Sequence, residues 1–343
     1  MLEELRAEIA AAGGWISFAR YMELALRAYY GRGEHQFGAQ GDFVTAPELG
    51  RVFGRTLARQ LAELEGPILE FGAGSGALAE VLTQELDRQY LILETSAPLR
   101  ARQAARLGRK VQFIDRLPEA FRGVVIANEV VDALPAHAVG WRDEGIVERG
   151  VGFAGKLIWR EEPASGAVLE AAKEIDVPAP YDSEIGLAAR AWMRTAAERL
   201  ESGTIFVIDY GFPSSEYYHP QRSMGTLMCH ARHRAHSDPF ERPGEQDITA
   251  HVDFSALAQA AHAAGLEVLG YTTQAQFLVN CGITEVLGQA NLENALHYAP
   301  IAAEAQVLLS PNEMGELFKV LAVGRGVKLP LLGFSRGDRS NRL

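Results

Sequence analysis

Residues 67–80 read PILEFGAGSGALAE, an apolar run that ends in three alternating glycines, Gly72, Gly74 and Gly76, and then continues with helical spacing. This order is typical of a strand, a tight loop and a helix. Glycines suit such a loop because a backbone without Cβ turns sharply and lets a ligand approach the main-chain N–H groups. The stretch therefore predicts a cofactor-binding loop at the carboxyl end of a strand.

Two classes of cofactor fit a loop of this spacing. Its glycines match the G-x-G-x-x-G/A dinucleotide pattern, and Glu94 follows about 20 residues later, where a ribose-binding acid is expected. Glu70 favours the other class, because two residues before the first glycine it would face the pyrophosphate of a dinucleotide. Two like charges about 4 Å apart repel by about 4 kcal/mol at an effective dielectric constant near 20. S-adenosylmethionine (SAM) presents an amino group and a sulfonium there, so the same carboxylate attracts it.

Length, composition and charge indicate what kind of protein this is and which partners it can have. The chain has 343 residues, 48% of them hydrophobic, enough for one large or two small well-buried domains. An acidic N-terminal stretch and the absence of a long apolar run lead us to expect a cytoplasmic protein without membrane insertion. The two cysteines are too few for a disulfide framework. A net charge of −11 argues against nucleic acid as a partner and favours a cationic one.

Strand and helix patterns alternate from residue 68 onward. The expected strands are 68–72, 90–94, 110–115, 123–129, 203–211, 266–273 and 318–326. This order predicts an α/β fold with a doubly wound, mostly parallel sheet that binds its ligand at the carboxyl ends of the strands. Polar residues stand at five of these ends: Glu70, Glu94, Asp115, Asn128 with Glu129, and Asp209. We expect the first four positions to contact the cofactor.

The first 64 residues are expected to form a helical extension or lid ahead of a core at 65–343. Helical spacing predicts three helices, at 2–12, 15–30 and 45–64. Thr45 is the expected N-cap of the third helix, with Glu48 completing a capping box.

Two segments interrupt the regular alternation. Residues 136–162 contain short β-like runs between turn residues, which predicts an inserted antiparallel meander. Residues 212–247 are rich in Pro, Ser, His and Arg, and we interpret them as a long functional loop or lid. A helix is expected at about 183–201, and the tail 326–343 is expected to be a surface extension.

Three histidines, His230, His233 and His236, recur at every third position. Only a helix would place all three on one face, and the neighbouring Arg232 and Arg234 would repel a cation. Zinc prefers a preformed ligand set supported by further acids, which the segment lacks. No metal site is predicted.

The residues after the fourth strand point to the chemistry. Asn128, Glu129 and Asp132 follow one another where a methyl group would be delivered. Methyl transfer from a sulfonium is an in-line displacement that needs an oriented nucleophile and little else. Because a guanidinium is cationic, carboxylates can hold it in a bidentate pair and disperse its growing positive charge. Glu129 and Asp132 fit this role, with Asn128 beside them.

The chain resembles the MidA-like family of SAM-dependent methyltransferases, which includes a mitochondrial complex I assembly factor. The matching stretches are 41–54 (GDFVTAPELGRVFG), 68–82, 126–139 (IANEVVDALPAHAV), 206–211 (FVIDYG), 225–254 and 315–326. The resemblance implies a class I methyltransferase fold with a helical N-terminal part and arginine methylation on a subunit of a respiratory complex. It assigns SAM binding to the three glycines and Glu94, and the acceptor site to Asn128, Glu129 and Asp132.

The same resemblance implies a cover over the site. Asp42, Phe43 and Thr45 match the family's G-D-F-x-T segment, which we expect to lie over the cofactor. A later signature of less certain role is matched by His233, Asp247, Thr249, His251 and Asp253. Asp209 and His251 are counted among the substrate or lid residues. One departure is that residues 26–31 (LRAYYG) lack a proline that relatives usually carry before the G-D-F segment.

The sequence thus predicts a SAM-dependent methyltransferase that modifies an arginine side chain of a protein partner. Two alternatives remain open at this point. One is a non-catalytic assembly or interaction protein that keeps SAM as a structural ligand and docks partners through its insertions. The other is an NAD-dependent oxidoreductase, which Glu70 disfavours.

Overall fold

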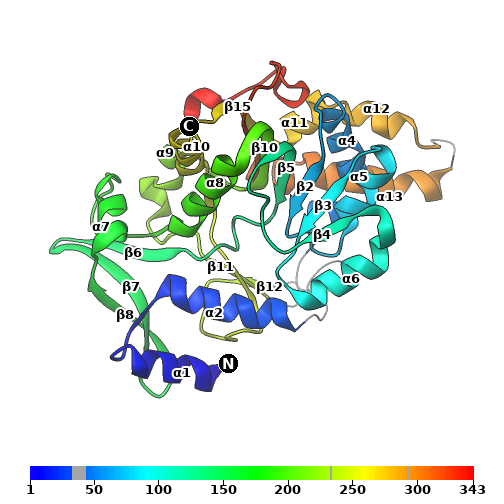
Figure 1. Ribbon diagram of the computed structural model, residues 1–343. Helices are drawn as coiled ribbons and strands as arrows, with labels where there is room; N and C mark the ends of the chain where they lie inside the picture. The colour runs from blue at the N-terminus through cyan, green and yellow to red at the C-terminus, as the bar shows by residue number, and fades with distance from the viewer. Residues whose placement is uncertain (33–43, 232–233, 292–293) are drawn as a thin grey trace.

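The computed structural model describes residues 1–32, 44–231, 234–291 and 294–343. The strands of its main sheet are β2 (Ile68–Phe71), β3 (Tyr90–Leu93), β4 (Gln112–Ile114), β5 (Phe121–Asn128), β10 (Leu200–Phe212), β14 (Val252–Asp253), β15 (Glu267–Thr273) and β16 (Phe318–Arg325). They lie in the order β15-β16-β10-β5-β2-β3-β4, with β14 beside β10 (Figure 1). The strands from β10 to β4 are parallel, and β16 is antiparallel to both its neighbours. The predicted doubly wound, mostly parallel α/β fold is confirmed.

Helices cover both faces of this sheet. The first layer contains α4 (Val52–Leu61), α5 (Ala77–Glu85), α6 (Ala97–Leu107), α11 (Gln274–Asn280), α12 (Ile283–Gly288) and α13 (Ala295–Leu309), and the second contains α8 (Leu187–Arg199) and α10 (Phe254–Ala263). The strands feed both layers because successive side chains point to opposite faces. In β5, Val124 and Ile126 join the first core, whereas Val125 and Ala127 join the second. Burial on both faces explains why this strand reads as a continuous apolar run.

A second, antiparallel sheet carries the N-terminal helices. It contains β1 (Ile16–Ser17), β6 (His137–Arg142), β7 (Gly145–Phe153), β8 (Leu157–Pro163) and β9 (Tyr181–Ile185). The antiparallel meander expected at 136–162 is present as β6, β7 and β8. Helices α1 (Leu2–Ala11) and α2 (Phe18–Gly31) share a hydrophobic core with this sheet (Figure 1). The first two helices therefore pack on the insertion rather than on the main sheet.

Two expectations about boundaries are wrong. The helix expected from residue 183 begins at Leu187, because 181–185 is β9 and pairs with β6. The segment 212–247 is not an irregular loop in its described part, which contains α9 (Ser214–Tyr217) and the sheet of β11 (Met228–Ala231), β12 (Arg234–His236) and β13 (Asp247–Thr249). Tyr217 and Cys229 of this part are 2% and 0% exposed. Short strands with few apolar residues gave too weak a pattern to be recognised.

The tail is also not a surface extension. Leu331 and Phe334 are 1% and 5% exposed and belong to the first core of the main sheet. The ring of Phe334 packs edge-on against Phe277 of α11, with the ring centroids 5.4 Å apart. Two apolar residues in a segment rich in glycine and charge were enough to anchor it.

Within the described residues, no helix combines the length and apolar character that crossing a membrane requires.

The helix expected from Thr45 to Leu64 is broken, and its capping box is absent. It is divided into α3 (Ala46–Leu49) and α4, with the extended residue Gly50 between them. The Thr45 side chain makes no cap hydrogen bond. Instead, the carboxylate of Glu129 accepts a hydrogen bond of 3.0 Å from the N–H of Ala46. A distant side chain therefore takes the place of the local cap.

Candidate active site

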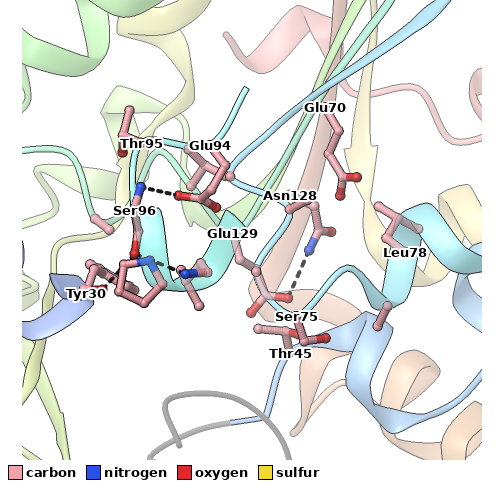
Figure 2. Close-up of a pocket in the computed structure, with 18 of the residues that line it drawn as sticks. Tyr30, Thr45, Glu70, Ser75, Leu78, Glu94, Thr95, Ser96, Asn128 and Glu129 are labelled. Atoms are coloured by element: carbon pink, nitrogen blue, oxygen red, sulfur yellow. Dashed lines mark hydrogen bonds between the residues drawn. The ribbon is translucent and has the colours of Figure 1, made fainter. Parts of the chain in front are cut away.

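A cavity of about 670 Å³ opens at the carboxyl ends of β2, β3 and β5 (Figure 2). Its walls come from the glycine loop, from residues 94–99, from residues 128–134, and from α2 and α3. The predicted site residues that line it are Glu70, Gly72, Gly74, Glu94, Asn128, Glu129 and Thr45. A cavity of this size accommodates a nucleoside-sized cofactor together with part of a second substrate.

The glycine loop has the backbone conformation that its sequence predicted. Gly72, Gly74 and Gly76 have φ angles of 56°, 54° and 84°, which side-chain-bearing residues rarely adopt. Gly76 is the N-cap residue of α5, so the positive end of this helix lies at the loop. The side chain of Gln103 fixes the loop from outside by donating a hydrogen bond of 2.9 Å to the carbonyl of Gly74. Loop N–H groups next to a helix N-terminus suit the carboxylate of a methionyl group.

Glu70 lies at the end of β2 and lines the cavity, but it is only 3% exposed. The hydroxyl of Tyr90 donates a hydrogen bond of 2.7 Å to one of its carboxylate oxygens. Burial raises the pKa of Glu70 to about 7, against the opposing effect of the Tyr90 hydrogen bond. In the ligand-free protein this carboxyl group is therefore divided between its neutral and ionised forms near neutral pH. A cationic ligand favours the ionised form.

This position predicts that the affinity for SAM depends on pH. Because the pKa of Glu70 is about 7 without ligand, a cation that needs the carboxylate binds about fivefold more weakly at pH 6 than at pH 7. Binding should also release protons, and calorimetry in buffers of different ionisation enthalpy measures both effects. In Glu70→Gln, which keeps an oxygen to accept from Tyr90, the pH dependence over this range should disappear. An equal dependence in wild type and variant would assign it to another group.

Glu94 lies directly after β3, the strand that pairs with the strand of Glu70 (Figure 2). It is 9% exposed. Its two carboxylate oxygens accept hydrogen bonds of 2.8 Å from the N–H of Ser96 and 3.0 Å from the side chain of Gln103. These bonds fix the carboxylate at the cavity wall, while each oxygen keeps a lone pair for a further donor. The arrangement suits a pair of ribose hydroxyls.

The backbone conformation is unusual at Glu129, directly after β5 ends at Asn128. Glu129 has a φ of 54°, and it is the only non-glycine residue with a positive φ in the described part of the chain. Such strain persists where the surrounding structure imposes it, and it concentrates at functional sites. Asn128 donates a hydrogen bond of 3.2 Å to the Glu129 carboxylate (Figure 2), and its own buried amide oxygen has no partner among the described residues. Burial, together with the nearby charges of Asp132 and Glu48, raises the pKa of Glu129 to about 8.

The side chain of Asp209 stabilises the strained turn at Glu129 through hydrogen bonds to the backbone. This residue of β10 is fully buried. One of its carboxylate oxygens accepts hydrogen bonds from three consecutive N–H groups, those of Val130, Val131 and Asp132, at 3.3, 3.0 and 3.3 Å. Burial and the nearby acids raise the pKa of Asp209, whereas the N–H donors stabilise its ionised form. Asp209 does not line the cavity, so it positions the turn rather than touching a ligand.

Several predicted site residues lie elsewhere. Asp115 does not line the cavity, because its side chain is 83% exposed and forms an ion pair with Arg100. Asp132 is buried behind the cavity wall, where its carboxylate accepts a hydrogen bond from the hydroxyl of Tyr210. His251 packs against Tyr210 and Phe212 on the same far side.

The remaining predicted positions have other surroundings. Gly76 caps α5 beside the cavity without lining it. Asp42 and Phe43, expected to cover the cofactor, lie outside the described residues, as does His233. His230 and His236 lie on the strands β11 and β12 rather than on one helix face.

Sequence reasoning missed one side of the cavity. Leu26, Arg27 and Tyr30 of α2 line it, although the helix expected at 15–30 was given no residue in the cofactor site. The hydroxyl of Tyr30 donates a hydrogen bond of 3.0 Å to Asp247, and its carbonyl accepts one of 2.8 Å from the Ser96 hydroxyl. No local pattern signals these contacts, because they join segments far apart in the chain.

Comparison with known proteins identifies the family to which the chain belongs. The family model of S-adenosyl-L-methionine-dependent methyltransferases matches residues 49–272. Among relatives, the mitochondrial protein arginine methyltransferase NDUFAF7 homolog of Drosophila melanogaster is 28% identical, covering 98% of this chain and 88% of its own. The human mitochondrial protein arginine methyltransferase NDUFAF7 is 27% identical, and the match covers 94% of this chain and 83% of the human protein.

A solved structure is more similar still. A crystal structure from Burkholderia thailandensis, bound to S-adenosyl-homocysteine, is 47% identical and superposes with a TM-score of 0.95. The match covers 100% of this chain and 96% of the other. Together with the glycine loop, Glu70 and the cavity, these findings favour a methyl donor over a dinucleotide. The chain belongs to the family of S-adenosyl-L-methionine-dependent methyltransferases that its sequence resembles, and SAM is its cofactor.

Proposed function

We propose that this methyltransferase transfers its methyl group to an arginine side chain of a protein partner. The observation that carries the proposal is the sign of the charges around Glu129. Its part-buried carboxyl lines the cofactor cavity, and the charged groups that raise its pKa are two further acids, Asp132 and Glu48. Like charges brought together out of water favour a cationic ligand between them. A guanidinium meets that need and also matches carboxylate oxygens in a planar, bidentate geometry.

Asn128 completes the arrangement for such a ligand. Its buried amide oxygen lacks a partner among the described residues. An unpaired acceptor in this position is costly unless a ligand donates to it. The N–H groups of a guanidinium can be shared between this oxygen and Glu129, which would orient one nitrogen toward the methyl donor. Orientation is what an in-line displacement chiefly requires.

The reaction also needs an acceptor for one proton. When bound, SAM supplies a methyl group on a positively charged sulfur. As the carbon–sulfur bond breaks and a nitrogen–carbon bond forms, the guanidinium nitrogen gives up a proton and the product keeps a single positive charge. Glu129, whose pKa lies at about 8 before a cation arrives, lines the cavity and is suited to take that proton.

The acceptor class is supported by similarity as well. Relatives that span most of this chain carry the name protein arginine methyltransferase, and the family resemblance points to a subunit of a respiratory complex. The chain's net charge of −11 suits a basic peptide segment.

The proposal predicts methylation that depends on arginine. Incubated with labelled SAM, an arginine-bearing peptide from a candidate partner should be methylated, whereas the same peptide with lysine in place of arginine should not. Mass spectrometry of partner proteins from a deletion strain should show the loss of one arginine mark. Transfer to lysine would overturn the acceptor class. An unchanged methylome with intact SAM binding would favour the non-catalytic role.

A further inference from the structure

A second, much smaller cavity lies behind the wall of the active site. Its volume is about 20 Å³, close to the space that one water molecule requires. Leu134 lines both this cavity and the cofactor cavity. On the other side, Arg190, Asp253 and Ala256 line both this cavity and an outer pocket of about 440 Å³. We call it the inner cavity.

Polar atoms without partners gather around the inner cavity. The polar side chains that line it are Asp132, Arg190, Tyr217, His251 and Asp253. Four of these have a buried atom with no hydrogen-bond partner among the described residues: Asp132 Oδ1, Arg190 Nε, His251 Nδ1 and Asp253 Oδ2. Only Tyr217 is satisfied, through Glu184 and Thr226. Buried polar groups are rarely left unpaired, so four around one small cavity require an explanation.

Other contacts hold the side chains of Asp132, Asp253 and His251 in place. Asp132 uses its second oxygen to accept from Tyr210, and Asp253 uses its other oxygen to cap α10 and to accept from Ser214. The ring of His251 stacks on Phe212 at an interplanar angle of 6°. The unpaired oxygens of Asp132 and Asp253 therefore cannot turn toward other donors without disturbing hydrogen bonds that these side chains already make.

We propose that one ordered water molecule occupies the inner cavity and joins Asp132, on the active-site side, to Asp253, Arg190 and His251. The hydrogen-bond inventory matches. Water donates two hydrogen bonds, which the carboxylate oxygens of Asp132 and Asp253 can accept. It accepts two, which Arg190 Nε–H and a neutral His251 in its Nδ1–H tautomer can donate. A metal ion fits less well because the guanidinium of Arg190 would repel it.

The water gives Asp132 a role in acceptor binding, a step that rests on the proposed function. With the Tyr210 hydroxyl on one oxygen and the water on the other, the buried carboxylate keeps its negative charge. That charge acts on Glu129 and contributes to the potential felt by a cationic acceptor. Asp132 is thus a positioning residue, which helps to hold the acceptor without lining the cofactor cavity.

A crystal structure that resolves ordered waters tests the site directly, whatever the acceptor is. One peak within hydrogen-bond distance of Asp132 and at least two of the other three atoms supports the inference. An empty cavity, a metal at coordination distances, or direct pairing of these side chains with closure of the cavity would overturn it.

The role of the water is tested by filling the cavity without touching a polar group. Ala256→Val adds two carbons at the cavity wall, and Ala260→Val adds them one helical turn later, outside the cavity, at a similarly buried position (6% and 8% exposed). The first variant should raise KM for the arginine peptide about tenfold, as expected for a charged group that loses one hydrogen bond.

The second variant should leave that KM unchanged, and neither should alter the affinity for SAM. Equal effects of the two variants, or an unchanged KM in Ala256→Val with the water shown to be absent, would refute the role. If wild type modifies another residue, the same comparison made with that acceptor still decides the role of the water, and only the proposed acceptor fails.

Discussion

Replacing Glu129 by glutamine is expected to lower the rate of methyl transfer by about 10²- to 10⁴-fold, the range typical of losing a general base. The amide keeps an oxygen that can accept the hydrogen bond from Ala46, so α3 should stay in place. What the variant loses is the negative charge that holds a guanidinium and the capacity to take its proton. The loss should therefore appear in kcat and in KM for the acceptor, while the affinity for SAM stays near that of wild type.

Transfer of label from SAM measures the first effect and calorimetry the second. Asp115→Asn is the matched control, because it removes one carboxylate from another strand end whose side chain is exposed and outside the cavity. It should alter neither quantity. Wild-type transfer in Glu129→Gln would show that the acceptor is held by other residues.

Gly74→Val is expected to weaken SAM binding by at least about 100-fold, which corresponds to about 2.7 kcal/mol. Two effects combine in this variant. The backbone at residue 74 has a φ of 54°, where a β-branched residue costs about 1–3 kcal/mol. In addition, the isopropyl group would project from a residue that lines the cofactor cavity, in the path by which a ligand reaches the loop's N–H groups.

Gly155→Val separates strain from obstruction. Gly155 also has a positive φ, 76°, but no described residue lies within 4 Å of the Cβ position. It is in the turn between β7 and β8 and does not line the cavity. Both variants should lower the thermal midpoint, and only Gly74→Val should lose SAM, as followed by calorimetry and by the stabilisation that added SAM gives. Equal SAM affinity in wild type and Gly74→Val would refute the assignment of the loop.

Local patterns predicted the part of the fold that local physics determines. The run from Ile68 to Ala77 combines a buried strand, glycines with no Cβ and a helix start, and each is set by residues next to it in the chain. The antiparallel meander was recognisable for the same reason, since its turns and alternation lie within 136–162. Strand ends that carry Glu70, Glu94 and Asn128 followed from the rule that ligands meet parallel strands at their carboxyl ends.

What the sequence could not supply were the contacts between distant segments. Asp115 ends a strand like the others, but that strand is at the sheet edge, where its side chain faces solvent and Arg100. Glu129 and Asp132 are three residues apart, yet the turn held by Asp209 directs one to the cavity and buries the other behind it. The break at Gly50 likewise depends on Glu304, a residue of α13 whose carboxylate accepts from the N–H groups of Val52 and Phe53.

The cap that Glu129 provides to α3 has a thermodynamic consequence. The Glu129 carboxylate accepts the hydrogen bond from the first N–H of α3, and in the proposed reaction it also binds the acceptor. Pro47 and Glu48 of that helix form part of the wall of the cofactor cavity. An acceptor that draws the carboxylate away from the N–H of Ala46 weakens the cap of α3, and so changes the stability of the cavity wall that contacts the cofactor. Reciprocity then requires that each ligand alter the binding constant of the other by the same factor, so the two substrates of this enzyme should not bind independently.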